Sequence, residues 1–150
     1  MSDPIKDASE SGWIAEHRAK YLADPKAGHL WDSTFAGGPG PLPTLLLTTR
    51  GAKSGQESVM PLLYGKVDGG YAIIASKGGH PKHPAWFHNL RAHPDTTVQI
   101  GREKREVHAR VATPVERERL WPKAVATYSG YEGYQERTDR EIPVVILEPR

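Results

Sequence analysis

The chain has 150 residues, of which 37% are hydrophobic and 25% charged, a balance that fits one soluble globular domain and argues against a disordered or repeat protein. It contains no cysteine, which excludes disulfides, thiolate catalysis and sulfur-ligated metals. Its net charge of only +2 gives no general attraction for nucleic acid, so any anion site must be local.

The first 43 residues are predicted to form an N-terminal arm and linker. Residues 12–22 read as a short amphipathic helix or a mobile arm, ended before Asp24-Pro25. A turn-rich stretch at 37–43 leads to a buried strand at 44–49, where we place the start of the main domain, residues 44–150. The chain shows no signal-peptide pattern and no apolar run near the roughly 20 residues of a membrane span, so we expect a cytoplasmic protein.

Two hairpins are predicted in the middle of the chain. Residues 58–67 and 71–76 flank Asp68-Gly69-Gly70, whose glycines accept positive φ in a tight turn. Pro61 removes a donor from the first of these strands, so we expect an edge strand or a bulge there. Residues 96–100 and 106–111 form the second hairpin, in which an apolar face of Val107, Ala109 and Val111 alternates with polar residues.

Short helices are predicted around these hairpins. Residues 84–93 begin with a proline and are stopped by Pro94. Thr113 and Glu116 match a capping box that starts a helix. Pro122 should break or kink this helix after Trp121, and the chain should continue helically toward Tyr128. Residues 144–147 supply a last strand. About six strands, two or three helices and no βαβ alternation favour a mainly β (α+β) fold, an antiparallel barrel with helices at its rim.

Two strand exits carry the residue types of an anion site. They are Thr49-Arg50-Gly51-Ala52-Lys53-Ser54-Gly55 and Ser76-Lys77-Gly78-Gly79. Backbone N–H groups and lysines in such loops can cradle a phosphate, and glycines let a flat ring approach the backbone. The helix that starts near Pro84 adds a partial positive charge. Ordinary glycine turns are the alternative interpretation, because the spacing is not that of a P-loop.

Tyr128, Tyr131 and Tyr134 recur at every third position, which places them on one stripe roughly 120° wide if the segment is helical. Ordinary core packing is one interpretation. Gly130 and Gly133 each weaken a helix by about 1 kcal/mol, so a mobile wall or lid is the other. Phenols suit a partly wet aromatic pocket and can donate a hydrogen bond or a proton.

Other kinds of site find little support. The histidines at positions 80, 83, 88 and 93 lack the carboxylate companions of a metal centre, so we predict no metal. The motifs of serine hydrolases and of dinucleotide-binding folds are also missing. Basic residues and aromatics do not cluster as in a nucleic-acid interface, and we expect no nucleic-acid partner.

Over residues 45–149 the sequence resembles the deazaflavin-dependent nitroreductases, small split β-barrel proteins with an FMN-binding-like fold that use coenzyme F420. The motifs that carry the resemblance are Leu46-Leu47-Thr48-Thr49, Gly51-Ala52-Lys53-Ser54-Gly55-Gln56, Ala75-Ser76-Lys77-Gly78-Gly79, Pro84-Ala85-Trp86-Phe87-His88-Asn89-Leu90, Trp121-Pro122, the three tyrosines, Thr138-Asp139-Arg140 and Ile142-Pro143-Val144-Val145. The resemblance implies a split β-barrel and a deazaflavin cofactor.

Carried over by position, the resemblance also implies the site residues. Those predicted to hold the coenzyme phosphate are Ala52, Lys53 and Ser54. Those predicted to line the coenzyme are Ser58, Val59, Met60, Pro61, Leu62, Leu63, Ile74, Ala75, Ser76, Lys77, Gly78, Ala85, Trp86, Phe87, His88 and Asn89. Those predicted to act on the acceptor are Ser76, Tyr128, Tyr131 and Tyr134, with Trp13 as a cover for the pocket.

The chain departs from the family pattern at three of these positions. Ala52 and Ser58 stand where the best-known members have arginine, and Met60 stands where they have asparagine. The chain would therefore bind the phosphate and the coenzyme tail more weakly, or would bind them through Arg50, Lys53 and Lys77 instead.

The function implied is an oxidoreductase that transfers a hydride from reduced F420 to a quinone, a nitroaromatic or an activated enone. Two alternatives stay open. One is a non-catalytic module that binds a deazaflavin, a flavin or a tetrapyrrole, and the other is an FMN-dependent reductase of the same barrel class. A lipophilic quinone would be compatible with peripheral membrane contact, and either a monomer or a homodimer is expected.

Overall fold

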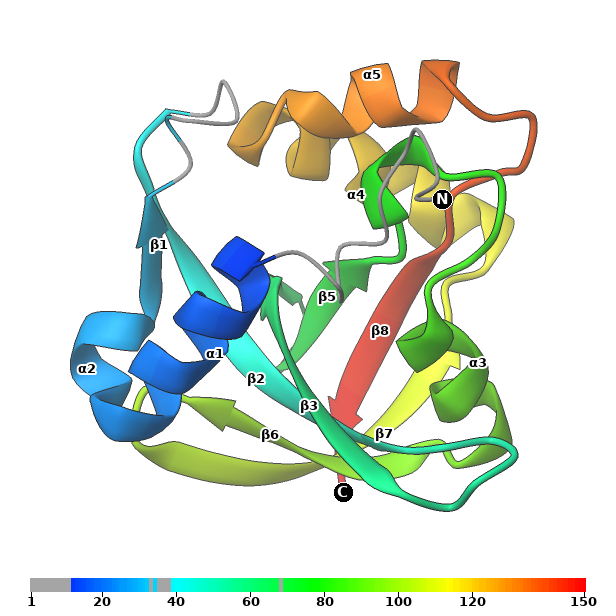
Figure 1. The fold of residues 1–150 in the computed structure, drawn as a ribbon. Coiled ribbons are helices and arrows are strands. Elements are labelled where there is room, and N and C mark those ends of the chain that lie inside the picture. The colour runs from blue at the N-terminus through cyan, green and yellow to red at the C-terminus, as the bar shows by residue number, and fades with distance from the viewer. Residues whose placement is uncertain (1–11, 33, 35–38, 68) are drawn as a thin grey trace.

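Antiparallel strands form a curled sheet around the main core (Figure 1). The computed structural model describes residues 12–32, 34, 39–67 and 69–150. Its strands are β1 (Leu30–Asp32), β2 (Pro41–Arg50), β3 (Glu57–Leu63), β4 (Gly65–Val67), β5 (Gly70–Ile74), β6 (Asp95–Ile100), β7 (Glu103–Val111) and β8 (Val144–Pro149). They follow the order β1-β2-β6-β7-β8-β5-β4, and β3 pairs with β2. The antiparallel split-barrel architecture expected from the sequence is confirmed.

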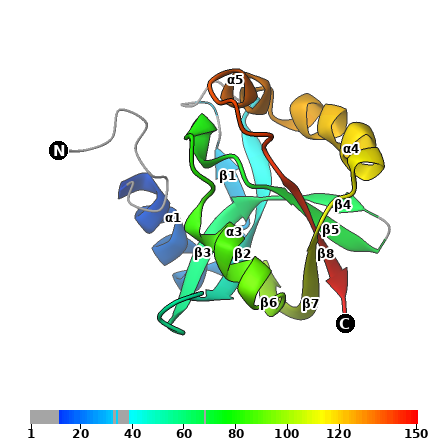
Figure 2. The same ribbon diagram turned by 90° about the vertical axis from the view of Figure 1, so that its right-hand side faces the viewer.

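Short helices lie around the rim of the sheet (Figure 2). The helices α1 (Gly12–Ala23) and α2 (Pro25–Gly28) flank one side, and α3 (Ala85–Ala92) flanks another. The helices α4 (Pro114–Thr127) and α5 (Gly130–Glu136) cover the outer face of β5 and β8, and a 3-10 turn, η3 (Lys77–Gly79), follows β5. Both predicted hairpins form, as β4–β5 and β6–β7.

The strand count differs from the prediction of about six, because the described residues form eight. The strand β1 was missed because it has only three residues and lies beside turn formers. The stretch 58–67 divides at Tyr64, whose side chain is buried in the core. Pro61 lies as expected in a strand with one described partner, since β3 pairs only with β2.

The first predicted helix ends before Asp24-Pro25 as expected, since α1 stops at Ala23. Asp24 then caps a second short helix that was not expected, and its carboxylate accepts from the Ala27 N–H. One strand expectation needs correction. Val111 is 47% exposed, so the apolar alternation of β7 stops at Ala109. The helix α4 runs past Pro122 to Thr127, in agreement with the expected helical continuation toward Tyr128. Pro122 and Glu118 are both exposed, so water can reach the Glu118 carbonyl that loses its donor.

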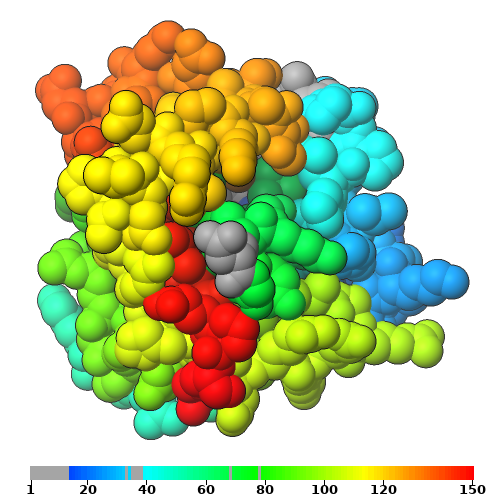
Figure 3. Space-filling model, turned by 180° about the vertical axis from the view of Figure 1, so that it is seen from behind, coloured from blue at the N-terminus to red at the C-terminus, as the bar shows by residue number. Residues whose placement is uncertain are grey.

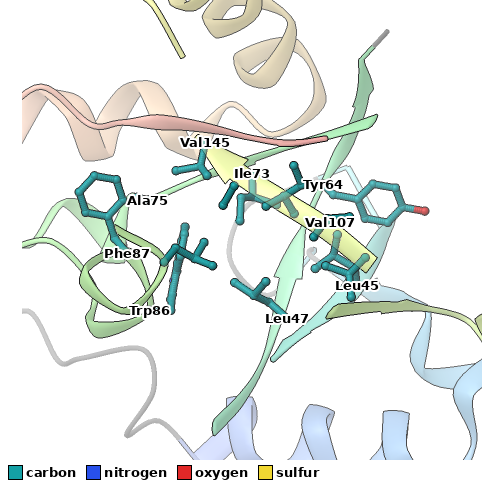
Figure 4. Packing of buried hydrophobic residues seen from close by; sticks show 13 residues of the cluster. Leu45, Leu47, Tyr64, Ile73, Ala75, Trp86, Phe87, Val107 and Val145 are labelled. Carbon is teal, nitrogen blue, oxygen red and sulfur yellow. The ribbon is translucent and has the colours of Figure 1, made fainter. Parts of the chain in front are cut away.

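Aliphatic and aromatic side chains from most strands and from α3 fill the curled sheet. Figure 4 shows this core, which includes Leu45, Leu47, Ile73, Trp86 and Val107. The strand β8 is buried on both faces, and the outer face of β5 is partly covered, because the residues that alternate with core positions pack under α4 and α5. The outer layer is therefore a second apolar interface.

Hydrogen bonds of Tyr21 fix the N-terminal helices to the sheet. Tyr21 is fully buried, and its hydroxyl donates to the Thr44 carbonyl at 2.9 Å and accepts from the Gly101 N–H at 2.8 Å. Gly28 is required beneath it, because a Cβ there would lie 2.3 Å from the Tyr21 Cα. The helix α1 thus packs on the barrel, while the division of the chain at residue 44 stays a prediction.

We predict that Tyr21→Phe lowers the free energy of unfolding by about 1–3 kcal/mol, because it leaves buried backbone groups without their partner. Urea denaturation would measure the loss. Tyr71→Phe is the matched control, since the Tyr71 hydroxyl forms no hydrogen bond with the described residues. Equal stability of the two variants would contradict this role of Tyr21.

Candidate functional site

The loop between β2 and β3 leaves two adjacent backbone donors free. The Gly51 N–H donates to the Gln56 carbonyl at 2.8 Å, the Gly55 N–H donates to the Gly51 carbonyl at 2.9 Å, and the Gln56 N–H donates to the Ser54 hydroxyl at 3.2 Å. Within the described chain, the N–H groups of Lys53 and Ser54 have no partner. These two N–H groups are therefore available to an anionic ligand, and the predicted phosphate site stays a prediction.

Asn89 on α3 holds this loop in place. Its side-chain oxygen accepts from the Ala52 N–H at 3.0 Å, and its amide nitrogen donates to the Thr49 hydroxyl at 3.1 Å. A groove of about 480 Å³ opens here between the loop and α3. Its lining comprises Gly51, Ala52, Lys53, Ser54, Gln56, Glu57, Ser58, Ala85, His88 and Asn89.

The groove has the donor set that a phosphate needs. Lys53 contributes an exposed ammonium, and the Ser54 hydroxyl can donate outward because it accepts from the loop. The Glu57 carboxylate also borders the groove and opposes an anion at that end. An anionic group therefore fits best against Lys53 and Ser54.

A second loop, from Ala75 to His83, is held by the guanidinium of Arg140. This side chain donates to the carbonyls of Ala75 at 3.2 Å, Ser76 at 2.8 Å and His80 at 2.9 Å, and to His83 Nδ1 at 3.0 Å. Partial burial and then the charge of Arg140 lower the pKa of His83, which keeps the imidazole neutral and able to accept. One side chain thus fixes the loop that carries Ser76.

The same loop packs directly on the backbone of α5. Gly79 has a φ of +81°, and a Cβ at this position would lie 2.7 Å from the Tyr134 carbonyl oxygen. Lys77 has a φ of +47°, which is uncommon for a residue with a side chain. Ser76 is 9% exposed, and its hydroxyl forms no hydrogen bond with the described residues.

The three predicted tyrosines gather into one aromatic layer, although they do not share a helix. The helix α4 ends at Thr127, Tyr128 adopts an extended conformation, and α5 starts at Gly130. The Tyr128 and Tyr131 rings meet edge to face with centroids 5.0 Å apart, and the Tyr128 and Tyr134 hydroxyls are 2.9 Å apart. The expectation of a single helical stripe was wrong, but the expected convergence occurs.

Gly130 has a packing role in this layer. A Cβ there would lie 2.6 Å from the Tyr128 ring, so the glycine gives the ring its place. Burial raises the pKa of Tyr128, as does its hydrogen bond with Tyr134. Burial is also the main cause that raises the pKa of Tyr131, whose hydroxyl forms no hydrogen bond with the described residues. Both phenols therefore stay protonated at neutral pH.

The structure separates the remaining predicted residues by the direction of their side chains. Ala75, Trp86 and Phe87 are buried in the main core, and Met60 and Leu62 pack against it. Any coenzyme contact at the three buried positions would come mainly from backbone atoms, whereas Met60 and Leu62 are half-buried and keep part of the side chain accessible. Leu63 and Ile74 instead pack against the tyrosine layer. Trp13 and Gly78 lie outside the residues whose surroundings the structure describes, so their predicted contacts stay predictions.

Arg140 belongs to one of the motifs that carry the family resemblance, but no role was predicted for it. In the sequence, Arg140 is a charged residue close to a strongly apolar strand. This position does not distinguish a partly buried arginine that holds a loop from an ordinary surface arginine. Trp31, Leu42 and Trp121 also pack on the tyrosines, and no local pattern indicated this. In the described part of the chain, no three His, Asp or Glu side chains group as a metal site would require.

Comparisons with known proteins bear on this geometry. The family model described as F420H(2)-dependent quinone reductase matches residues 18–149. The chain belongs to this family. The F420H(2)-dependent quinone reductase Rv1261c of Mycobacterium tuberculosis is 42% identical to it over 115 residues, which cover 75% of this chain and 77% of that protein.

Solved structures agree with the family and the fold. A structure described as an F420-H2 dependent reductase (FDR-A) is 46% identical, with a TM-score of 0.64, and the match covers 70% of this chain and 93% of that one. Another, described as a domain-swapped dimer, is 38% identical, with a TM-score of 0.67. The match covers 89% of this chain and 96% of that one. The family inferred from the sequence motifs is confirmed.

The described helices include none with the length and apolar character needed to cross a bilayer.

We predict that Arg140→Ala weakens coenzyme F420 binding at least tenfold and lowers the free energy of unfolding by about 2–3 kcal/mol, because three carbonyls of the Ser76 loop lose a charged donor. Arg140→Lys should recover part of both losses. Absorbance titration and urea denaturation would measure them. Arg102→Ala is the control, since Arg102 is exposed and forms no bond with the described residues. Unchanged coenzyme affinity in the folded Arg140→Ala protein would refute the link.

Proposed function

We propose that the chain catalyses the reduction of a quinone by reduced coenzyme F420. The observation that carries this proposal is the position of the Ser76 loop, which packs on the α5 backbone at Gly79 and continues toward α3. A coenzyme anchored at Lys53 and Ser54 would run along β3 and α3 toward Ser76. Its ring would then lie near the tyrosine layer. Nitroaromatics and activated enones are further proposed acceptors.

The bound coenzyme would supply a hydride from C5, so that a quinone takes up this hydride and one further proton to become a hydroquinone. The chain's own residues would bind the coenzyme, orient the acceptor and supply the proton. Lys53 and the free N–H groups of Lys53 and Ser54 would hold the phosphate. The Ser76 hydroxyl, which has no described partner, would donate to the acceptor oxygen as negative charge develops.

The tyrosine layer would bind the flat acceptor and donate the proton. Tyr131 has a hydroxyl with no described partner, while Tyr134 shares a hydrogen bond with Tyr128. A coenzyme carrier needs no second aromatic surface of this kind, which favours an enzyme over a binding module. Edge-to-face rings also exclude water, which strengthens each hydrogen bond made there.

The deciding experiment compares coenzyme F420 with FMN in binding titrations and then adds menadione to the reduced complex. We expect tight F420 binding and rapid reoxidation of the coenzyme. Binding without reoxidation would indicate a carrier, and preference for FMN would contradict the proposed cofactor. Lys53→Ala should weaken F420 binding about tenfold, equivalent to ~1.4 kcal/mol for a lost charged contact, and Lys104→Ala on β7 should leave it unchanged.

The tyrosine layer gives a prediction for pH dependence. A tyrosine with its ordinary pKa of about 10 starts to ionise above about pH 9. Ionisation would remove the proton that the tyrosine donates. Burial raises the pKa of Tyr128 and Tyr131, so menadione reduction should show no tyrosine ionisation up to about pH 10. Tyr131→Phe should lower kcat with little change in coenzyme affinity. A loss of kcat/KM near pH 8 that Tyr131→Phe abolishes would contradict this assignment.

A further inference from the structure

A second pocket lies between the β4–β5 hairpin and α4, apart from the groove beside α3. We call it the back pocket, and its volume is about 230 Å³. Figure 3 shows a recess on this face of the molecule, below α4 and beside the hairpin. Aliphatic side chains make most of its wall, namely Leu63, Val67, Ile74, Leu120, Ala124 and Val144.

The back pocket exists because α4 and the hairpin diverge above the outer face of β5. Ala72 and Ala124 are small, so the two surfaces do not fill the space between them. Tyr131 closes the pocket on the side of the tyrosine layer and is 8% exposed. A cavity with aliphatic walls favours an aliphatic ligand over a polar one.

Two lysines at the pocket add a positive charge that no described residue neutralises. Lys66 on β4 and Lys123 on α4 both border it, and the described part of its lining contains no Asp or Glu. Neither ammonium forms an ion pair with a described residue. Both lysines are exposed, so their charge costs little to maintain and stays available to a ligand.

We propose that the back pocket binds an aliphatic carboxylate, with its chain among the aliphatic side chains and its headgroup between Lys66 and Lys123. The volume matches this ligand class. With roughly 30 Å³ for each water-sized group, the pocket holds about eight such groups, the size of a medium-length chain. The site is separate from the phosphate groove, and the proposal does not depend on the proposed reaction.

The test is a titration of the intact protein with sodium octanoate, followed by NMR of the side-chain methyl groups. We expect saturable shifts at Leu63, Val67, Leu120 and Val144, with 1-octanol at least tenfold weaker and octylammonium without effect. Hexanoate should bind roughly 16-fold more weakly than octanoate, because each buried methylene contributes about a fourfold change in affinity.

Variants test separately how the two lysines bind the headgroup and how the aliphatic walls bind the chain. Lys66→Gln combined with Lys123→Gln should reduce octanoate affinity to that of octanol, whereas Lys104→Gln, on the distant strand β7, should not. Ala72→Phe should fill the pocket and abolish binding of both ligands, with thermal melting as the check on folding. Equal affinity for octanoate and octanol, full octanoate affinity in the double variant, or methyl shifts outside the pocket would each overturn the proposal. Menadione reduction without octanoate should be unchanged in the double variant, which keeps this test distinct from that of the reductase function.

Discussion

The guanidinium of Arg140 joins the two halves of the candidate site. It reaches from the segment after α5 to three carbonyls of the loop after β5, which would otherwise need other donors. The loop then has one position, set against the backbone of α5 by Gly79. The placement of Ser76 relative to the tyrosines follows from these contacts. A flexible loop could not hold a ring and an acceptor at a fixed separation.

Much of the fold follows from local patterns in the sequence. The Asp68-Gly69-Gly70 turn, the alternation of Val107 and Ala109, and the capping box at Thr113 each specify an element that the structure contains. These patterns succeed because backbone geometry and burial act over a few residues. Short elements such as β1 and α2 were missed, since they depend on pairing with β2 and on packing under Tyr21. Such contacts join residues that are distant in the sequence. The secondary-structure propensity of a short segment therefore cannot predict them.

The candidate site divides in the same way. Glycines and lysines at strand exits indicated both loops, and the tyrosine spacing indicated an aromatic cluster. The use of each donor could not be predicted, because it depends on which groups the fold brings together. Asn89 takes up the Ala52 N–H, and Gln56 takes up that of Gly51. The tyrosines meet because the chain turns at Tyr128, although a continuous helix would also have placed them on one side.

The distribution of unused donors is itself an argument for ligand binding. Among the described residues, no fully buried side-chain nitrogen or oxygen lacks a partner, so the interior is satisfied. The donors without a described partner include the N–H groups of Lys53 and Ser54 and the hydroxyls of Ser76 and Tyr131. These groups lie at the phosphate groove, the second loop and the tyrosine layer, the three places that an elongated anionic coenzyme and its acceptor would occupy. Their presence at these places, in a chain whose described interior is satisfied, supports the proposal that a ligand binds there.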